Sequence, residues 1–384
     1  MRGTRPICRA QSVMCALMCA CSLQSLVADA PKVVDDPDLR KLVKAVRSEF
    51  NVPAISVAMV DGGGTIRIAA DGVRKAGGED CVTTADRFHL GSCTKAMTAT
   101  AIAAVVRTTE LRWDSTLEDV LPDLATECHA GFRMVTLRQL VDHQAGLPAN
   151  SQLMWKVDGS KSLTAQRVEL LERALTKMPA HDPGSTYLYS NLGFLLAALM
   201  AEKTSGTCWR DLMKEHVFGP LRMKSAGFGP PSEGNDVSQP WGHTLIGDKH
   251  QPTDLDNPPV LGPAGRVHAT LADWARFARL HLGHIQQGKP ANDSESDHLG
   301  IDKQMLKMLH KPEDGRNYTC GWVVMTRKWA KGKVLSHSGS NTSWYSVIWV
   351  APGIDRAYLA VVNAGHKRAF SACDAIISQM IQTD

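Results

Sequence analysis

The stretch Phe88-His-Leu-Gly-Ser-Cys-Thr-Lys-Ala-Met-Thr-Ala-Thr100 runs directly into six more apolar residues, 101–106. Lys95 is the only formally charged side chain in residues 88–106, and the residues around it are small or apolar. A helix that is apolar on every side is buried inside a protein. Because Gly91 interrupts the chain just before Ser92, we predict a buried helix that begins at Ser92 and ends near Glu110.

The spacing of Ser92 and Lys95 brings their side chains together, because residues three apart share a helix face. Burial lowers the pKa of a lysine, and the neutral amine is a base that can activate a serine hydroxyl as a nucleophile. The start of the helix adds free backbone N–H groups and the positive end of the helix dipole. The structural alternative is a capping serine and a lysine that reaches the surface. Ser-x-x-Lys occurs only once in the chain, which makes this pair the first candidate for catalysis.

The composition is that of a globular protein with a large core, since 43% of the 384 residues are hydrophobic and 21% are charged. This length predicts one large domain or two of medium size. The formal net charge is +4, and it falls to +2 when Met1–Ala30 is left out. A charge this small does not favour nucleic acid or an anionic membrane surface as a partner. We therefore expect a monomer that acts on a small-molecule or peptide substrate and has no stable membrane insertion.

Residues Met1–Ala30 are typical of an export signal. Three arginines precede an apolar stretch, Val13–Val27, and Ala28-Asp-Ala30 fits a small-x-small cleavage site. The apolar stretch is too short for a comfortable membrane span. We expect an exported protein, periplasmic or secreted, with a dispensable start or a lipid anchor at Cys19 or Cys21 as the alternatives.

The order of strand-like and helical segments indicates one mixed sheet built from both ends of the chain. Ile55–Val60 and Thr65–Ala70 form a predicted hairpin, and further strands are predicted at Val334–Ser338, Trp344–Val350 and Tyr358–Asn363. Helices are predicted at Leu39–Phe50, Leu137–His143, Ala165–Met178, Asn191–Thr204, Leu271–Leu282 and Ala369–Ile381. Pro230–Pro263 is expected to be mostly loop, and Gln287–His298 to be polar and mobile. The sheet subdomain would comprise about 31–115 and 320–384, and a helical subdomain about 116–319.

Two other short motifs carry reactive or polar side chains. Tyr189 and Asn191 flank a serine directly before an apolar helix, where Asn191 is alternatively a helix cap and Tyr189 an interface aromatic. Ser336-His-Ser-Gly-Ser340 lies on or just after a predicted strand. A single histidine such as His337 is more often structural than catalytic, and Gly339 allows a ligand to approach the backbone closely.

The ordered set Ser-x-x-Lys, Tyr-x-Asn and His-x-Gly resembles the serine β-lactamase-related family. This family includes D-Ala-D-Ala carboxypeptidases, D-aminopeptidases, esterases and the cephalosporinase type of β-lactamase. The resemblance extends from about Leu39 to Ile381, with supporting stretches at Val135–Pro148, Pro183–Gly193 and Pro263–Thr270. It implies an α/β (α+β) fold of the β-lactamase/transpeptidase type, in which a mostly antiparallel sheet is flanked by N- and C-terminal helices and carries a large helical insertion.

The resemblance also assigns catalytic roles. Ser92 would attack an acyl carbon and form an acyl-enzyme, while Lys95 and Tyr189 would share the proton transfers. A phenol is a weak base at its ordinary pKa, so we expect neighbouring cations to lower the pKa of Tyr189. The set needs no metal and no cofactor.

The remaining family positions would bind the substrate. Asn191 would hold its amide, and His337, Ser338 and Gly339 would line the opposite wall. The backbone N–H groups of Ser92 and Ser340 would form the oxyanion hole, which stabilises the charge that develops in the transition state.

One position departs from the β-lactamase pattern, because enzymes of that type normally have lysine where this chain has His337. Histidine near its ordinary pKa is only partly charged, and it attracts a β-lactam carboxylate less than lysine does. The resemblance therefore implies an exported serine hydrolase of amide or ester bonds. The alternatives are a β-lactamase or D-Ala-D-Ala carboxypeptidase acting on cell-wall peptides and, in another class, a non-catalytic penicillin-binding or sensor module.

Overall fold

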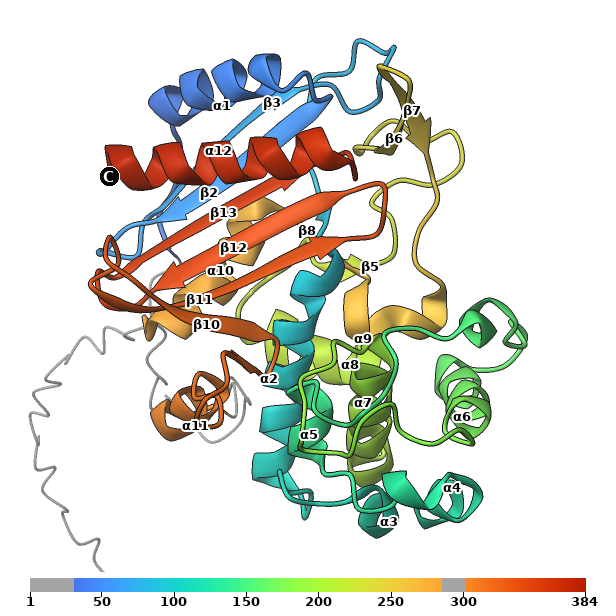
Figure 1. The fold of residues 1–384 in the computed structure, drawn as a ribbon. Coiled ribbons are helices and arrows are strands. Elements are labelled where there is room, and N and C mark those ends of the chain that lie inside the picture. Colours follow the sequence, from blue (N-terminus) through green and yellow to red (C-terminus); the bar gives the residue numbers. More distant parts are fainter. Residues whose placement is uncertain (1–30, 285–300) are drawn as a thin grey trace, which may run out of the picture.

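A computed structural model describes residues 31–284 and 301–384 of the protein (Figure 1). The predicted export signal, Met1–Ala30, and the predicted mobile segment, Gln287–His298, lie outside the described residues. None of the helices in the described ranges combines the length and apolarity needed to cross a membrane.

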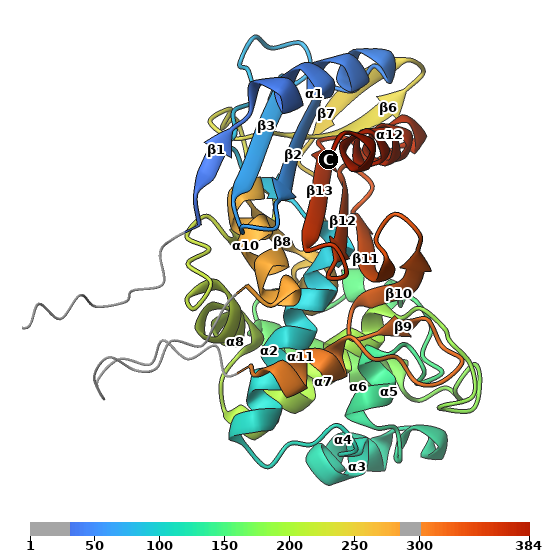
Figure 2. The ribbon, with the colours of Figure 1, turned by 90° about the vertical axis from the view of Figure 1, so that its left-hand side faces the viewer.

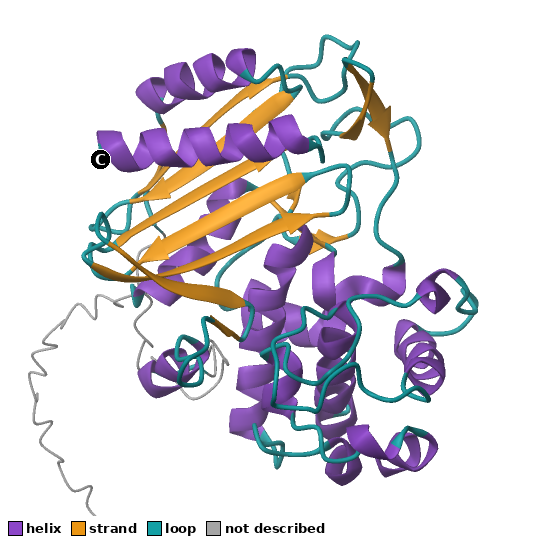
Figure 3. Cartoon of the chain, in the orientation of Figure 1, coloured by secondary structure: helices purple, strands orange, loops and turns teal. Residues whose placement is uncertain are grey.

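The core is an eight-stranded sheet with the order β1-β3-β2-β13-β12-β11-β10-β9 (Figures 1 and 3). Only the β1–β3 pair is parallel. The two ends of the chain meet where β2 pairs with β13, with Ile55 opposite Val362 and Val60 opposite Ala357. The strands are β1 (Val33–Asp35), β2 (Ala54–Val60), β3 (Ile66–Gly72), β9 (Tyr318–Thr319), β10 (Trp322–Arg327), β11 (Gly332–Ser340), β12 (Tyr345–Ala351) and β13 (Arg356–Val362). The predicted sheet from both chain ends is confirmed.

Helices cover both faces of this sheet. The terminal helices α1 (Pro37–Glu49) and α12 (Lys367–Thr383) pack on one face and on each other, and α10 (Leu271–Leu282) packs on the other (Figure 2). Strand β2 is buried on both sides because its alternate side chains enter the two separate apolar clusters. We had expected α10 in the helical subdomain, but its apolar face, with Trp274 and Phe277, is buried beside the sheet.

The second layer is helical and is organised around α2 (Thr94–Thr108) and α7 (Asn191–Ser205), which pack against each other. Residues 94–105 of α2 and 192–202 of α7 are all buried, which confirms the predicted all-round apolar helix. Shorter helices surround this pair: α3 (Leu117–Val120), α4 (Pro122–Glu127), α5 (Leu137–Val141), α6 (Leu163–Ala174), α8 (Trp209–Met213), α9 (Gly262–Gly265) and α11 (Lys303–Leu309). Single turns lie at η1 (Gly91–Cys93), η2 (Ala130–Phe132), η3 (Gln152–Trp155), η4 (Lys214–Phe218) and η5 (Pro259–Leu261).

The segment Pro230–Pro263 is more ordered than its composition suggested. It contains a hairpin of β6 (Gly242–Ile246) and β7 (Lys249–Thr253), joined by Gly247-Asp248, in which Gly247 has a φ of +60°. A two-residue turn with a positive φ at its first position suits a hairpin, and the surrounding prolines and glycines obscured it in the sequence. A small sheet of β4 (Phe88–His89), β8 (Val267–Ala269) and β5 (Gly227–Phe228) leads the chain into the turn that carries Ser92.

Candidate active site

Ser92 lies in a tight turn between β4 and α2. The turn depends on Gly91, whose φ is +51°, in the left-handed region that favours glycine. A Cβ at Gly91 would lie 2.5 Å from the backbone nitrogen of Ser340, so no side chain fits there. The turn that carries Ser92 therefore packs directly against the end of β11.

Two side chains reach the hydroxyl of Ser92. The Nζ of Lys95 lies 3.1 Å from Ser92 Oγ, and the phenol of Tyr189 donates a hydrogen bond of 2.7 Å to the same oxygen. The first contact was expected from helix spacing. The second joins residues 97 positions apart, and the packing of α2 against α7 brings them together.

Lys95 is fully buried, and burial lowers the pKa of its amine well below the ordinary value. Its Nζ donates to the Oδ1 of Asn191 at 2.7 Å and to the carbonyl oxygen of Ala264 at 2.6 Å. A neutral amine has two N–H groups and one lone pair. Because both N–H groups are already used, the lone pair is left for the proton of the Ser92 hydroxyl.

Tyr189 behaves differently from the expectation, because burial raises the pKa of its phenol and the cations expected to lower it do not act. The physical reason is that desolvation of the phenol outweighs the hydrogen bond that it donates to Ser92. The phenol thus stays protonated and serves as a donor to Ser92 Oγ.

Asn191 is the first residue of α7 and does not cap it. Ser190 is the cap, and its Oγ accepts the backbone N–H of Gly193 at 3.1 Å. This leaves the Asn191 side chain free to bind Lys95 through Oδ1 and to donate through Nδ2 to Asn150 at 2.7 Å. The sequence did not single out Asn150, which belongs to no motif, or the Ala264 carbonyl, which lies in the supporting stretch Pro263–Thr270 but is a backbone group with no side-chain signal.

Strand β11 borders the site mainly with its backbone rather than with its side chains. A Cβ on Gly339 would lie 2.7 Å from the Ser92 nitrogen and 2.1 Å from the Leu90 oxygen, so the strand lies directly on the nucleophile turn. Ser338 pairs with Val347, which packs in the cluster under α1 and α12. Side chains alternate along a strand, and Ser338 therefore points to the opposite face of the sheet. This corrects the expectation that its side chain lines the site.

The side chain of His337 points to the face of the sheet on which Ser92 lies, but it is buried more deeply in the core than expected. Its side chain is buried, and it is not among the residues that line the cavity at Ser92. Nδ1 donates to the Ser338 carbonyl at 2.6 Å, while Nε2 accepts from the hydroxyl of Tyr318 at 3.2 Å. Burial lowers the pKa of His337 to about 3, so the ring is neutral. The expectation that its imidazole forms the cavity wall is not met.

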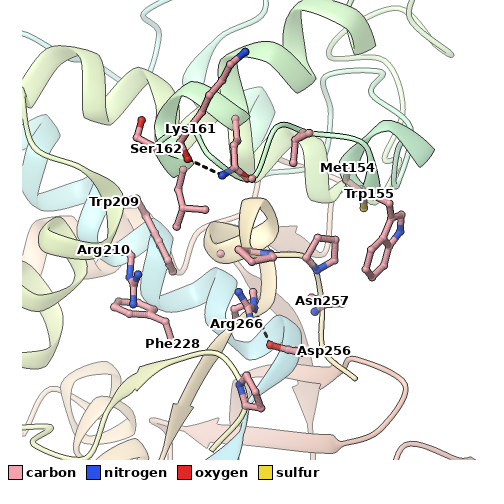
Figure 4. A pocket seen from close by; sticks show the side chains of 18 of the residues that line it. Met154, Trp155, Lys161, Ser162, Trp209, Arg210, Phe228, Asp256, Asn257 and Arg266 are labelled. Atoms are coloured by element: carbon pink, nitrogen blue, oxygen red, sulfur yellow. Dashed lines mark hydrogen bonds and ion pairs between the residues drawn. The ribbon is translucent and has the colours of Figure 1, made fainter. Parts of the chain in front are cut away.

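A cavity of about 550 Å³ opens at Ser92, and its lining includes Asn191, Ser340 and Trp155. It adjoins a larger cavity of about 1040 Å³, with which it shares Met154, Trp155, Asn257 and Pro258 (Figure 4). Within residues 31–284 and 301–384, no three His, Cys, Asp or Glu side chains gather as a metal-binding group. Cys93, next to the nucleophile, is a free buried thiol, and burial raises its pKa to about 12.

Comparison with known proteins agrees with this geometry. The sequence model of the family described as Beta-lactamase matches residues 39–379. The chain belongs to the Beta-lactamase family. It is 27% identical over 341 residues to a penicillin-binding protein 4 from Amycolatopsis lactamdurans, covering 85% of this chain and 84% of that protein. It is also 28% identical over 326 residues to a D-aminopeptidase from Brucella ovis, covering 82% of this chain and 57% of that protein.

Among solved structures, a class C beta-lactamase has the same fold, with a TM-score of 0.70, 18% identity, and coverage of 89% of this chain and 95% of that one. The chain spans only about half the length of several curated relatives, such as an Aspergillus campestris unguisins hydrolase, of which it covers 47%. Membership of the Beta-lactamase family makes the protein a serine hydrolase with a β-lactamase/transpeptidase-like fold, in a family that acts on amide or ester substrates.

Proposed function

We propose that the protein is an exported serine hydrolase that cleaves amide or ester bonds through an acyl-enzyme on Ser92. Lys95 is the base in this proposal, and Tyr189 is a proton donor. The observation that supports it is the position of Ser92 Oγ between a desolvated amine at 3.1 Å and a protonated phenol at 2.7 Å. Export is proposed from the signal-like composition of Met1–Ala30.

In the acylation step, Ser92 Oγ attacks the acyl carbon while its proton moves to the lone pair of Lys95. The bond to the leaving oxygen or nitrogen then breaks, and the leaving group takes a proton from Lys95, directly or through Tyr189. In the second step a water molecule attacks the acyl carbon and gives a proton to the same base. The bond to Ser92 Oγ then breaks, Oγ takes that proton back from Lys95, and the acid is released. The N–H groups of Ser92 and Ser340 hold the oxyanion in both steps.

The substrate proposed is an ester or amide without a carboxylate close to the reacting bond. His337 supports this choice because its neutral, buried ring has both nitrogens in hydrogen bonds and presents no fixed charge to an anion. The second cavity beyond Trp155 has room for an acyl group much larger than acetyl.

The test is a substrate and probe panel on the mature protein and on Ser92→Ala. We expect a fluorophosphonate to add to Ser92, p-nitrophenyl acetate to be turned over with a higher kcat/KM than a cephalosporin, and Ser92→Ala to lose both labelling and turnover while it keeps its circular dichroism spectrum. Labelling that survives in Ser92→Ala contradicts the proposal.

The same panel separates the alternatives. Preferred turnover of the cephalosporin favours a β-lactamase, and preferred release of D-alanine from a D-Ala-D-Ala peptide favours a carboxypeptidase. A penicillin adduct on Ser92 that is stable for hours, without turnover of any substrate, favours a binding or sensor module.

A further inference from the structure

Asp256 is a nearly buried carboxylate, 6% exposed, on the loop between β7 and η5. It has three polar partners, two of which, His89 and Asn341, come from distant parts of the chain. Oδ1 lies 3.0 Å from the Nε2 of His89, off the ideal hydrogen-bond direction, and accepts from the Nδ2 of Asn341 at 2.8 Å. Oδ2 accepts from the Nε of Arg266 at 2.7 Å, as Figure 4 shows. None of these residues belongs to the motifs that define the catalytic group.

The first partner leads to the nucleophile turn. His89 is fully buried on β4, and its Nδ1 accepts the backbone N–H of Gly91 at 3.1 Å. An accepting Nδ1 carries no proton, so in the neutral ring the proton lies on Nε2, the atom that faces Asp256. The contact with Gly91 constrains the Leu90–Gly91 peptide, one peptide before the one that carries the Ser92 N–H, and thereby limits the directions in which that N–H can point.

The second partner leads to the other side of the oxyanion hole. Asn341 directly follows Ser340 at the end of β11. Its Nδ2 is bound by Asp256, and its Oδ1 accepts the backbone N–H of Ser343 at 3.2 Å. The side chain thus ties the end of the strand to the same carboxylate oxygen that faces His89.

The two segments joined in this way are in direct contact, with no room to adjust. A Cβ at Gly91 would be 2.5 Å from the Ser340 nitrogen, and one at Gly339 would be 2.7 Å from the Ser92 nitrogen. Donors in an oxyanion hole work only when they lie about 2.7–3.1 Å from the developing charge, so a small shift of either segment lowers the rate.

The geometry points to Asp256 as a positioning residue that clamps the two backbone halves of the oxyanion hole together, through His89 on one side and Asn341 on the other. This inference rests on the proposed acyl-enzyme function. Asp256 does not touch the reacting atoms, and it acts by holding the N–H groups of Ser92 and Ser340 at a fixed separation.

The site requires a carboxylate. Burial alone would raise the pKa of Asp256, but His89, Arg266 and Asn341 outweigh burial and hold that pKa below its usual range. Arg266 and Asn341 donate hydrogen bonds to Asp256, the Nε2 of His89 faces it at 3.0 Å, and an ionised carboxylate is the side chain that suits all three. An asparagine there has the same shape but turns an N–H₂ group toward one of the donors, which breaks at least one arm of the clamp.

The experiment compares an ester with its thiono counterpart, in which sulfur replaces the carbonyl oxygen. Sulfur is larger and accepts hydrogen bonds more weakly, so hydrolysis of the thiono ester depends less on the oxyanion hole. We expect Asp256→Asn to lower kcat for the oxo ester about 10- to 100-fold with little change in KM, because a displaced donor costs part of the 10²–10³ that one donor supplies. The oxo-to-thiono ratio of kcat/KM should fall by a similar factor.

Glu202→Gln is the matched control. Glu202 is a buried carboxylate, 4% exposed, which pairs with Arg167 and accepts the backbone N–H of Trp209 at 2.6 Å, and it has no contact with the oxyanion hole. The Glu202→Gln variant should lose about as much stability as Asp256→Asn and leave the oxo-to-thiono ratio of kcat/KM unchanged. Asn341→Ala, which removes one arm only, serves as the second variant and should lower the ratio even if Asp256→Asn folds poorly.

The outcomes are distinct. If Asp256→Asn and Asn341→Ala leave the oxo-to-thiono ratio of kcat/KM unchanged, even with lower rates for both esters, the proposed positioning role is wrong and Asp256 is only structural. If Ser92→Ala still turns over the oxo ester, the proposed function fails instead, whatever the ratio does.

Discussion

Lys95 and His337 are two buried bases near Ser92. They differ in whether a nitrogen lone pair is left without a hydrogen-bond partner. Lys95 has both N–H groups of its neutral amine in hydrogen bonds and keeps a lone pair toward Ser92 Oγ. His337 is also desolvated and neutral, but Nδ1 donates to Ser338 and Nε2 accepts from Tyr318, so no lone pair is free. Burial favours the neutral form of both groups, and the proposed role as a base needs a free lone pair beside a hydroxyl, which only Lys95 has.

Each base also has a neighbouring tyrosine, and the two tyrosines differ in the same way: one contacts Ser92 and the other does not. Burial raises the pKa of both Tyr189 and Tyr318, so both stay protonated and act as donors. Tyr189 donates to the nucleophile oxygen, whereas Tyr318 donates into the closed pair with His337. We infer that Lys95 and Tyr189 serve the proposed proton transfer, and that His337 and Tyr318 serve packing. The predictions below test this division.

The largest effect is expected for Lys95→Met, which keeps the apolar bulk of the side chain and removes the lone pair. Removal of a general base lowers kcat by about 10²–10⁴-fold. Single-turnover acylation by p-nitrophenyl acetate, followed as the burst of p-nitrophenol, measures this step directly. A burst that keeps its wild-type rate would show that another group takes the Ser92 proton.

The pH dependence should separate the two bases. Lys95 must be neutral to act, so kcat/KM should rise with pH through its pKa, which burial places well below the ordinary 10.5, and then level off. Below that pKa the rate falls about tenfold per pH unit. His337, with a pKa of about 3, is already neutral throughout the range and adds no limb. The profile should lose its acidic limb in Lys95→Met and keep it in His337→Gln.

A smaller loss is expected for Tyr189→Phe, which removes one hydrogen bond to Ser92 Oγ and leaves the ring in place. We expect kcat to fall about 10- to 100-fold, as for one lost hydrogen bond to a reacting atom. Tyr318→Phe is the matched control, because it removes an even more deeply buried phenol from the closed pair and should change kcat by less than about threefold. Equal losses in the two variants would contradict the division into an open and a closed pair.

Smaller still is the change expected for His337→Gln. The amide can keep one or both hydrogen bonds, and no group at the reacting atoms is lost, so kcat/KM for p-nitrophenyl acetate should change by less than about fivefold. Thermal unfolding of the same variant checks that any change is not a loss of folded protein. A drop as large as that of Lys95→Met would place His337 in the proton transfer.

The smallest effect concerns Trp155, which is 69% exposed and borders both cavities. Trp155→Ala should lower kcat/KM for p-nitrophenyl octanoate by about 2- to 10-fold, the value of one aromatic contact, and leave the acetate unchanged. Ile246→Ala, at an equally exposed apolar side chain on β6 that lines neither cavity, is the control. A loss that is the same for both esters would remove the second cavity from the substrate path.

Local sequence patterns predicted much of this molecule. The all-round apolar run after Ser92 predicted the buried helix α2, and its spacing predicted the contact with Lys95, because both depend on the 3.6-residue period of a helix. Alternation and turn residues likewise predicted β2, β3 and the C-terminal strands. The ordered motifs predicted the family, and the comparisons confirm it.

Other features could not be read from the sequence because they depend on which elements pack together. The pKa of Tyr189 rises where a fall was expected, because its direction depends on how deeply the fold buries the phenol. The side chain of Ser338 leaves the site because β11 pairs with β12 in a register that turns it toward α12.

The sequence by itself predicted Ser92 as the nucleophile and Lys95 as its base, and it determined the family and the sheet made from both chain ends, because each follows from short-range periodicity or from residue order. Only the tertiary structure decided which base is free to act, and only it brought His89, Asp256 and Asn341 together. These three residues lie on separate segments with no common motif. Burial, lone-pair direction and contact across long chain separations are properties of packing, and packing is set by the whole fold.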